Sequence, residues 1–197
     1  YAVYHGPKGL KYIAEKVHNN TVVLAKSLTS VGFSIKHSRF FDTLQISVAN
    51  NEKIKSIALR KKLNFYYPDQ TTVSISVNET TTLNDIGLIL SVFSEALEVN
   101  LKTEQSSEGF IPKDHIRTSE FLNNPVFNSH HSETELMRYI KRLERKDLAL
   151  NYSMISLGSC TMKLNAAVEM LPLSWSSWGN IHPFAPKDQV EGYTQVL

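Results

Sequence analysis

The six residues from Gly158 to Lys163 place several reactive side chains in one short run. Ser159, Cys160 and Thr161 follow the glycine, and a thioether and an amine complete the run. Apolar residues precede it, so the pattern predicts a strand, a glycine turn and then a helix start. The first N–H groups of a helix lack partners within the helix, so such a turn could hold an anion or a carboxylate. A plain helix cap fits the same pattern.

Two roles are open for Cys160, the only cysteine of the chain. A nucleophilic or redox thiol needs a base beside it, and His182 is the nearest histidine that follows in the sequence. Nothing in the sequence brings these two side chains together, so an inert thiol is the favoured interpretation. A single cysteine forms neither an internal disulfide nor a cysteine-rich zinc site, which indicates a reducing compartment.

A second polar loop contains Asn180, His182 and Phe184. An amide, an imidazole and an aromatic ring on an irregular segment are typical of a pocket wall, and packing of Phe184 onto the domain explains them equally well. His130 and His131 do not indicate a metal site, because adjacent residues point apart in regular structure. His131 precedes a helix cap and is expected to accept a hydrogen bond there.

The composition excludes several classes of protein. The 197 residues carry a net charge of +2, which gives no electrostatic reason to expect binding to nucleic acid or to an anionic membrane. No apolar run approaches the roughly 20 residues that a membrane span needs. Glycine-rich phosphate-binding motifs and the G-x-S-x-G nucleophile motif are also absent from the sequence.

Hydrophobic periodicity predicts a compact layered domain in the first hundred residues. The expected order is α-β-β-α-β-β-α, with the helices packed on a small and mainly antiparallel sheet. The near capping box of Thr82 and Asp85 should begin the last of these helices. The predicted helices are 8–30, 51–62 and 82–97, and the predicted strands are 33–37, 42–48, 64–67 and 71–77.

The rest of the chain is more irregular. Residues 98–120 are polar and are interpreted as a linker. A capping box of Ser132 and Glu135 predicts a helix over 133–147. A short helix is expected over 165–171, followed by a loop-like segment, 172–190. Elements at both ends of the sequence look interrupted, so we expect the chain to be a piece of a longer protein.

Several long runs of the sequence closely resemble glycine dehydrogenase (decarboxylating), the P-protein family of the glycine cleavage system. The runs extend from one end of the chain to the other. They are Tyr1-Ala2-Val3-Tyr4-His5-Gly6-Pro7, Phe40-Phe41-Asp42-Thr43-Leu44, the segment 121–135, the segment 157–165 and Asn180-Ile181-His182-Pro183-Phe184-Ala185-Pro186.

The resemblance implies an α/β fold of the type I pyridoxal-phosphate class, with two such halves in tandem. Residues 1–97 would be the small C-terminal domain that ends the first half, and 98–120 would be the linker. Residues 121–197 would open the second half, which carries the cofactor. The chain would therefore span the junction between the halves.

The resemblance also implies an activity and its partners. The family decarboxylates glycine with pyridoxal 5'-phosphate and passes the aminomethyl group to the lipoyl arm of the H-protein, as part of glycine catabolism. The cofactor lysine is expected outside this chain, so the chain alone should be inactive. Further implied partners are the other half of the same polypeptide and a second subunit. The compartment would be the bacterial cytoplasm or the mitochondrial matrix.

Within that family, the polar residues of the two loops are expected to line the entrance for glycine or the lipoyl arm. No residue of this chain is expected to be catalytic or to bind a metal, and the cofactor contacts are unknown. The alternative is a non-catalytic packing or dimerisation module. The expected channel-lining residues are Ser159, Cys160, Thr161, Lys163, Asn180 and His182.

Overall fold

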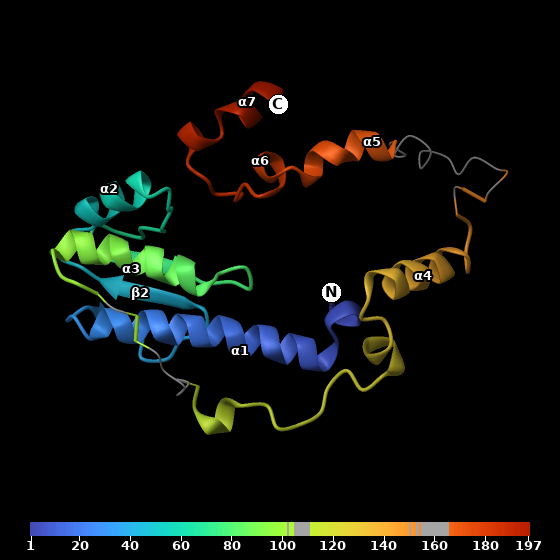
Figure 1. The fold of residues 1–197 in the computed structure, drawn as a ribbon, viewed down its shortest axis with the longest axis horizontal. Coiled ribbons are helices and arrows are strands. Elements are labelled where there is room, and N and C mark those ends of the chain that lie inside the picture. The colour runs from blue at the N-terminus through green and yellow to red at the C-terminus, as the bar shows by residue number, and fades with distance from the viewer. Residues whose placement is uncertain (102, 105–110, 150, 153, 155–165) are drawn as a thin grey trace. The chain divides into compact units, whose positions relative to one another are not determined.

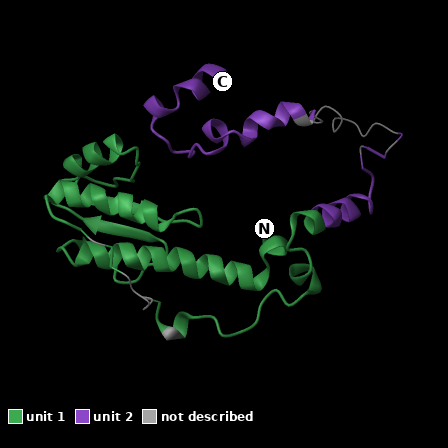
Figure 2. Cartoon of the chain, viewed as in Figure 1, with its two compact units in different colours: residues 1–136 green, residues 137–197 purple. Residues whose placement is uncertain are grey.

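The computed structural model divides the chain into two compact units, residues 1–136 and 137–197 (Figures 1 and 2). The described residues are 1–101, 103–104, 111–149, 151–152, 154 and 166–197. The predicted strand and glycine turn at 154–163 therefore lie almost entirely outside the described residues. Whether the boundaries at 97 and 120 separate domains of the parent protein remains a prediction.

Unit 1 combines three main helices with a small sheet, as predicted. Its elements are α1 (Ala2–Thr29), β1 (Ser34–Ile35), β2 (Thr43–Ser47), α2 (Glu52–Arg60), β3 (Thr72–Ser76) and α3 (Leu83–Leu97), followed by the 3-10 turns η1 (Lys113–His115) and η2 (Pro125–Asn128). The mixed fold and the antiparallel sheet are confirmed, and the type I arrangement of the whole enzyme remains a prediction.

The sheet has the order β1-β2-β3, and both pairs are antiparallel. In the register of β2 and β3, Leu44 faces Ile75 and Ile46 faces Val73. These four side chains are at most 3% exposed. Strand residues alternate between the two faces of a sheet, so the apolar alternation of the sequence sets which face meets the helices.

Helices α1, α2 and α3 supply the rest of one core. Helix α3 contacts both α1 and α2. Its start is fixed by the predicted capping box: the Thr82 hydroxyl accepts from the Asp85 N–H at 3.3 Å, and the Asp85 carboxylate accepts from the Thr82 N–H at 2.7 Å. The bond from the Thr82 N–H, and a second one from the Thr82 hydroxyl to the same carboxylate at 2.7 Å, lower the pKa of Asp85.

One predicted strand is wrong. Over 64–67 the structure has a single antiparallel bridge between Tyr66 and Ser74. Lys62 turns the chain just before this segment with a φ of 59°, and Pro68 follows it directly. Because proline has no N–H to donate, pairing is not continued past that point.

The Tyr67 hydroxyl is buried, and the described part of the chain provides no hydrogen-bond partner for it. Burial raises the pKa of Tyr67 to about 12. The neutral phenol is therefore favoured in the folded state, while an unfolded chain ionises it near pH 10. The contribution of this group to stability is complete below pH 10 and is lost as the pH rises towards 12.

We expect Tyr67→Phe to leave the free energy of unfolding at pH 7 unchanged or to raise it by up to about 1 kcal/mol, because it removes a buried polar group without a partner. Between pH 10 and 12 the free energy of unfolding should fall less in the variant than in the unmodified chain, because the variant has no Tyr67 hydroxyl to ionise. Urea unfolding at both pH values measures this, with Tyr66→Phe as the exposed control. A loss above about 1 kcal/mol at pH 7 would mean that the hydroxyl has a partner.

The first residues of the predicted linker lie on unit 1. Leu101 packs against the core. The Leu101 N–H donates to the Ser94 hydroxyl at 3.4 Å, and the Glu104 N–H donates to the Ser27 hydroxyl at 3.0 Å. This part of the segment is therefore attached to the helices of unit 1.

Unit 2 is built from short elements. Helix α4 crosses the division between the units and ends three residues earlier than predicted, and the predicted loop 172–190 contains short helical turns. The elements are α4 (Glu133–Glu144), α5 (Ala167–Met170), η4 (Leu171–Ser174), α6 (Ser176–Gly179), η5 (Lys187–Gln189) and α7 (Glu191–Val196). Trp178 packs on Tyr193 at 4.9 Å between ring centres, and the Tyr193 hydroxyl donates to the Trp178 carbonyl.

Candidate functional site

Of the six predicted channel residues, only Asn180 and His182 belong to the described residues, and both are exposed. Whether the six come together therefore remains a prediction. Asn180 directly follows α6 as its cap residue, and its N–H donates to the Ser176 carbonyl at 3.1 Å. Gly179 fits there because a Cβ would approach the Leu173 carbonyl oxygen to 2.8 Å.

The loop after α6 fixes the tautomer of His182. The Phe184 N–H donates to His182 Nδ1 at 3.1 Å, and the Ala185 N–H donates to the His182 carbonyl at 2.9 Å. An Nδ1 that accepts carries no proton, so the neutral imidazole has its N–H at Nε2. His182 therefore offers a hydrogen-bond donor of the kind that can hold a carboxylate or orient an acceptor.

A second group of residues joins two segments that are far apart in the sequence. His131 Nδ1 lies 2.7 Å from the Tyr4 carbonyl oxygen, and because a carbonyl only accepts, the ring nitrogen donates. From the sequence, His131 is expected to accept a hydrogen bond at the helix cap. For its Nδ1 this is wrong, because Nδ1 donates to Tyr4 instead. The Ser132 hydroxyl takes the cap position and accepts from the Glu135 N–H at 3.3 Å.

Gly6 makes this contact possible. Its φ of 63° and ψ of −179° interrupt α1, and Pro7 begins the continuous helix. A Cβ on Gly6 would lie 2.7 Å from both His131 Cε1 and the Phe127 carbonyl oxygen. Both segments stand out in the sequence, but the sequence does not pair them, because no local pattern reports a contact over 127 residues.

Aromatic rings pack around this junction. The His5 ring lies 4.4 Å from that of Tyr1 and 5.3 Å from that of Tyr4, measured between ring centres. The neutral His131 carries its proton on Nδ1, so its Nε2 is an acceptor. The tautomers of His131 and His182 are thus opposite. The packing of the junction indicates a structural role.

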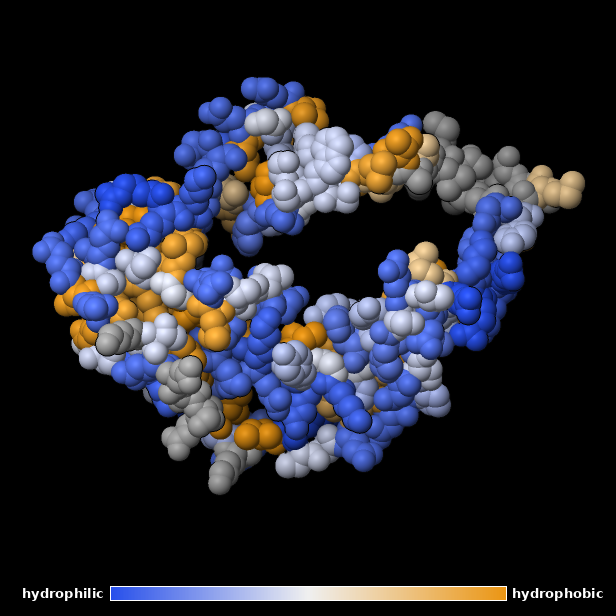
Figure 3. All heavy atoms as spheres, in the orientation of Figure 1, coloured by the Kyte–Doolittle hydropathy of each residue, from blue (hydrophilic) through white to orange (hydrophobic). Residues whose placement is uncertain are grey.

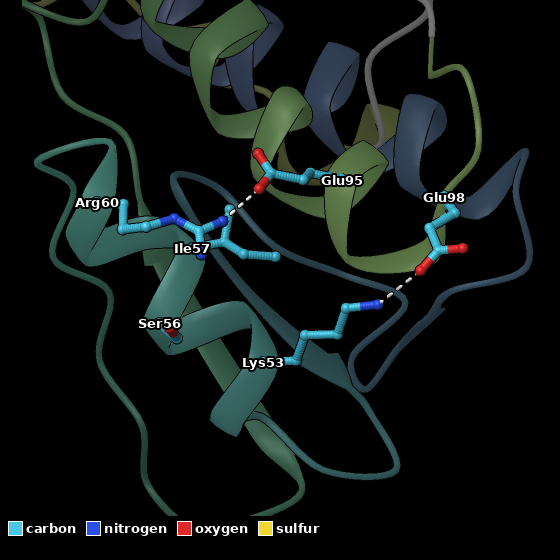
Figure 4. A pocket seen from close by; sticks show the side chains of 6 residues that line it. All are labelled: Lys53, Ser56, Ile57, Arg60, Glu95 and Glu98. Carbon is cyan, nitrogen blue, oxygen red and sulfur yellow. Dashed lines mark hydrogen bonds and ion pairs between the residues drawn. The ribbon is translucent and has the colours of Figure 1, made fainter.

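A pocket of about 400 Å³ lies between α2 and α3, and none of its lining residues is one of the six predicted ones (Figure 4). Lys53 pairs with Glu98 at 3.2 Å, and Arg60 pairs with Glu95. A hydrogen bond from Lys61 is the main cause that lowers the pKa of Glu95. The lining holds two cations and two carboxylates, so it offers no net positive charge to attract a phosphate.

The described residues lack two other classes of site. They contain no group of three or more histidine, cysteine, aspartate or glutamate side chains placed to hold a metal ion. In the same part of the chain, no helix combines the length and the apolar character that crossing a membrane requires.

Comparison with known proteins identifies the relatives of this chain. Residues 1–93 match the family model described as glycine cleavage system P-protein. Proteins named glycine dehydrogenase (decarboxylating) align with all of this chain: those of Flavobacterium johnsoniae and Christiangramia forsetii are 56% and 58% identical, and that of Shewanella halifaxensis is 48% identical. The chain covers 21% of each of these relatives. These matches confirm the resemblance predicted from the sequence: the chain is homologous to the glycine cleavage system P-proteins.

Proposed function

We propose that this chain is the junction region of a glycine decarboxylase that releases CO2 from glycine and passes the aminomethyl group to the lipoyl arm of the H-protein. The observation that carries the proposal is the 56% identity to a glycine dehydrogenase (decarboxylating) along the whole chain. The parent enzyme would use pyridoxal 5'-phosphate, which takes up the electrons left behind when CO2 departs. We place that cofactor and its lysine outside residues 1–197.

Within the parent enzyme, we assign different roles to the two units. Residues 1–97 hold a self-contained core, which supports a packing role for them. The loop at 180–184 supports a role at the entrance for glycine or the lipoyl arm, because the Nε2–H of His182 suits a carboxylate or carbonyl acceptor. Ser159, Cys160, Thr161, Lys163 and Asn180 would share this wall as polar neighbours.

We expect His182→Ala in the full-length enzyme to lower the rate of glycine–CO2 exchange at least about tenfold, equivalent to about 1.4 kcal/mol of lost transition-state stabilisation. Cys160→Ala should have an effect of the same order. Exchange of labelled CO2 into glycine measures this rate. The cofactor absorbance of each variant shows separately whether the enzyme has folded and loaded.

His37→Ala is the matched control, because it removes an exposed imidazole whose contact is with Gln45 in unit 1. It should exchange at the parent rate. If His182→Ala and Cys160→Ala both exchange CO2 at the rate of the unmodified enzyme, the proposed role of these residues at the entrance is refuted. A full-length parent that loads its cofactor but never exchanges CO2 with glycine would refute the proposed activity itself.

A further inference from the structure

The two units differ in how far their apolar side chains are buried. Among the described residues, the buried apolar side chains lie in unit 1, with Ala149 as the one exception. In the part of the chain that the structure describes, unit 2 holds fourteen of the exposed large apolar residues, against eleven in the larger unit 1. Figure 3 shows apolar surface on the C-terminal segment. Exposed apolar side chains mark an interaction site where they form a contiguous surface.

Helix α4 presents the most regular part of this surface. Met137, Ile140 and Leu143 are 60%, 49% and 44% exposed, and their spacing of three residues places them along one side of the helix. Lys141 and Glu144, four and seven residues after Met137, pair at 2.7 Å beside this stripe. No described residue of α4 is buried.

A helix of 12 residues is marginal in water by itself and normally owes its stability to packing of its apolar side. Each apolar side chain that becomes fully buried contributes about 1.5–3 kcal/mol. Burial of these three side chains against a partner would therefore stabilise the helix. It is also far smaller than the roughly 800 Å² per partner of a typical stable interface between separate proteins.

We propose that the apolar stripe of α4 (Met137, Ile140 and Leu143) docks on the part of the same polypeptide that lies outside residues 1–197. This rests on the proposed function, since the relatives are about five times as long as this chain. A surface too small to recruit a separate protein is sufficient within one polypeptide, where the effective concentration is in the millimolar range or above. A second copy of the chain would not have this advantage.

Hydrogen exchange in the full-length protein tests the docking. The backbone amides of residues 137–143 should exchange about 100-fold more slowly in the full-length protein than in the chain 1–197, because burial of the stripe suppresses local opening. Ile140→Gln in the full-length protein should remove most of that protection. Arg138→Gln is the matched control, because it introduces the same side chain at a neighbouring polar position, and it should keep the protection.

Each alternative occupant gives a different result. Equal exchange in the full-length protein and in the chain 1–197 would overturn the proposal, as would protection that depends on protein concentration, which would indicate a second copy. Loss of protection in both variants would show that the stripe is not what docks. Glycine–CO2 exchange by the same samples is a separate readout, so an inactive protein with a protected α4 refutes the activity and leaves the docking supported.

Discussion

Phe93→Ala is expected to lower the free energy of unfolding of the chain by about 3–5 kcal/mol, which is the usual effect of removing a buried phenyl ring. Phe93 is 0% exposed. Its ring meets that of Phe33 edge-on at 5.1 Å and lies 6.1 Å from that of Phe65, between ring centres. Phe93 therefore joins α3 to the residue that precedes β1 and to the segment between α2 and β3. The change would leave a cavity that these neighbours cannot fill without moving.

Urea unfolding followed by circular dichroism measures this loss. Phe184→Ala is the matched control, since it removes the same atoms from a side chain that is 90% exposed, and it should change the free energy of unfolding by less than about 0.5 kcal/mol. Similar losses in both variants, or a loss below about 1 kcal/mol for Phe93→Ala, would contradict the core described for unit 1.

The position of Phe93 could be predicted because local sequence determines it. Its stripe has helical spacing, and the capping residues Thr82 and Asp85 fix where the helix starts. The same spacing says less about the ends of the helix: Leu83 and Leu97 continue it but are 61% and 44% exposed. Periodicity identifies a helical face, and the extent of the neighbouring elements decides how much of that face is covered.

The parts that could not be predicted depend on contacts between distant segments. The segment 64–67 has the composition of a strand. After the turn at Lys62, however, only Tyr66 pairs with β3, and the local sequence does not show how many residues will pair. His131 was assigned to the nearest local feature, the helix cap, whereas its Nδ1 donates to Tyr4. The reactive run at Gly158 was identified from residue types alone, and its assembly with His182 remains a prediction.

The junction at Gly6 leads to the second large prediction. Gly6→Ala should lower the free energy of unfolding by about 2–6 kcal/mol. If the chain avoids this loss, it should do so by detaching residues 127–131 from the start of α1. A φ of 63° with an extended ψ costs a residue with a Cβ about 1–3 kcal/mol. Overpacking against the Phe127 carbonyl oxygen and the His131 ring adds a similar amount. The Phe127 oxygen belongs to the backbone, so it cannot move aside as a flexible side chain would.

Two other glycines of the same chain separate these causes. Gly87 lies inside α3, and a methyl group added there would meet no neighbouring segment within 4 Å, so Gly87→Ala should raise the free energy of unfolding by up to about 1 kcal/mol. Gly32 has a φ of 93° and the same open surroundings, so Gly32→Ala should show the conformational cost alone. Urea unfolding compares the three variants, and hydrogen exchange at 127–131 reports on the junction.

If Gly6→Ala costs no more than Gly32→Ala and leaves exchange at 127–131 unchanged, the close approach of His131 to the start of α1 is not a feature of the protein in solution. If Gly6→Ala is the most destabilising of the three and increases that exchange, the contact joins the start of α1 to residues 127–131 in solution. The Tyr4 carbonyl and the His131 ring would then hold together the two parts of the sequence that the family resemblance assigns to different halves of the enzyme.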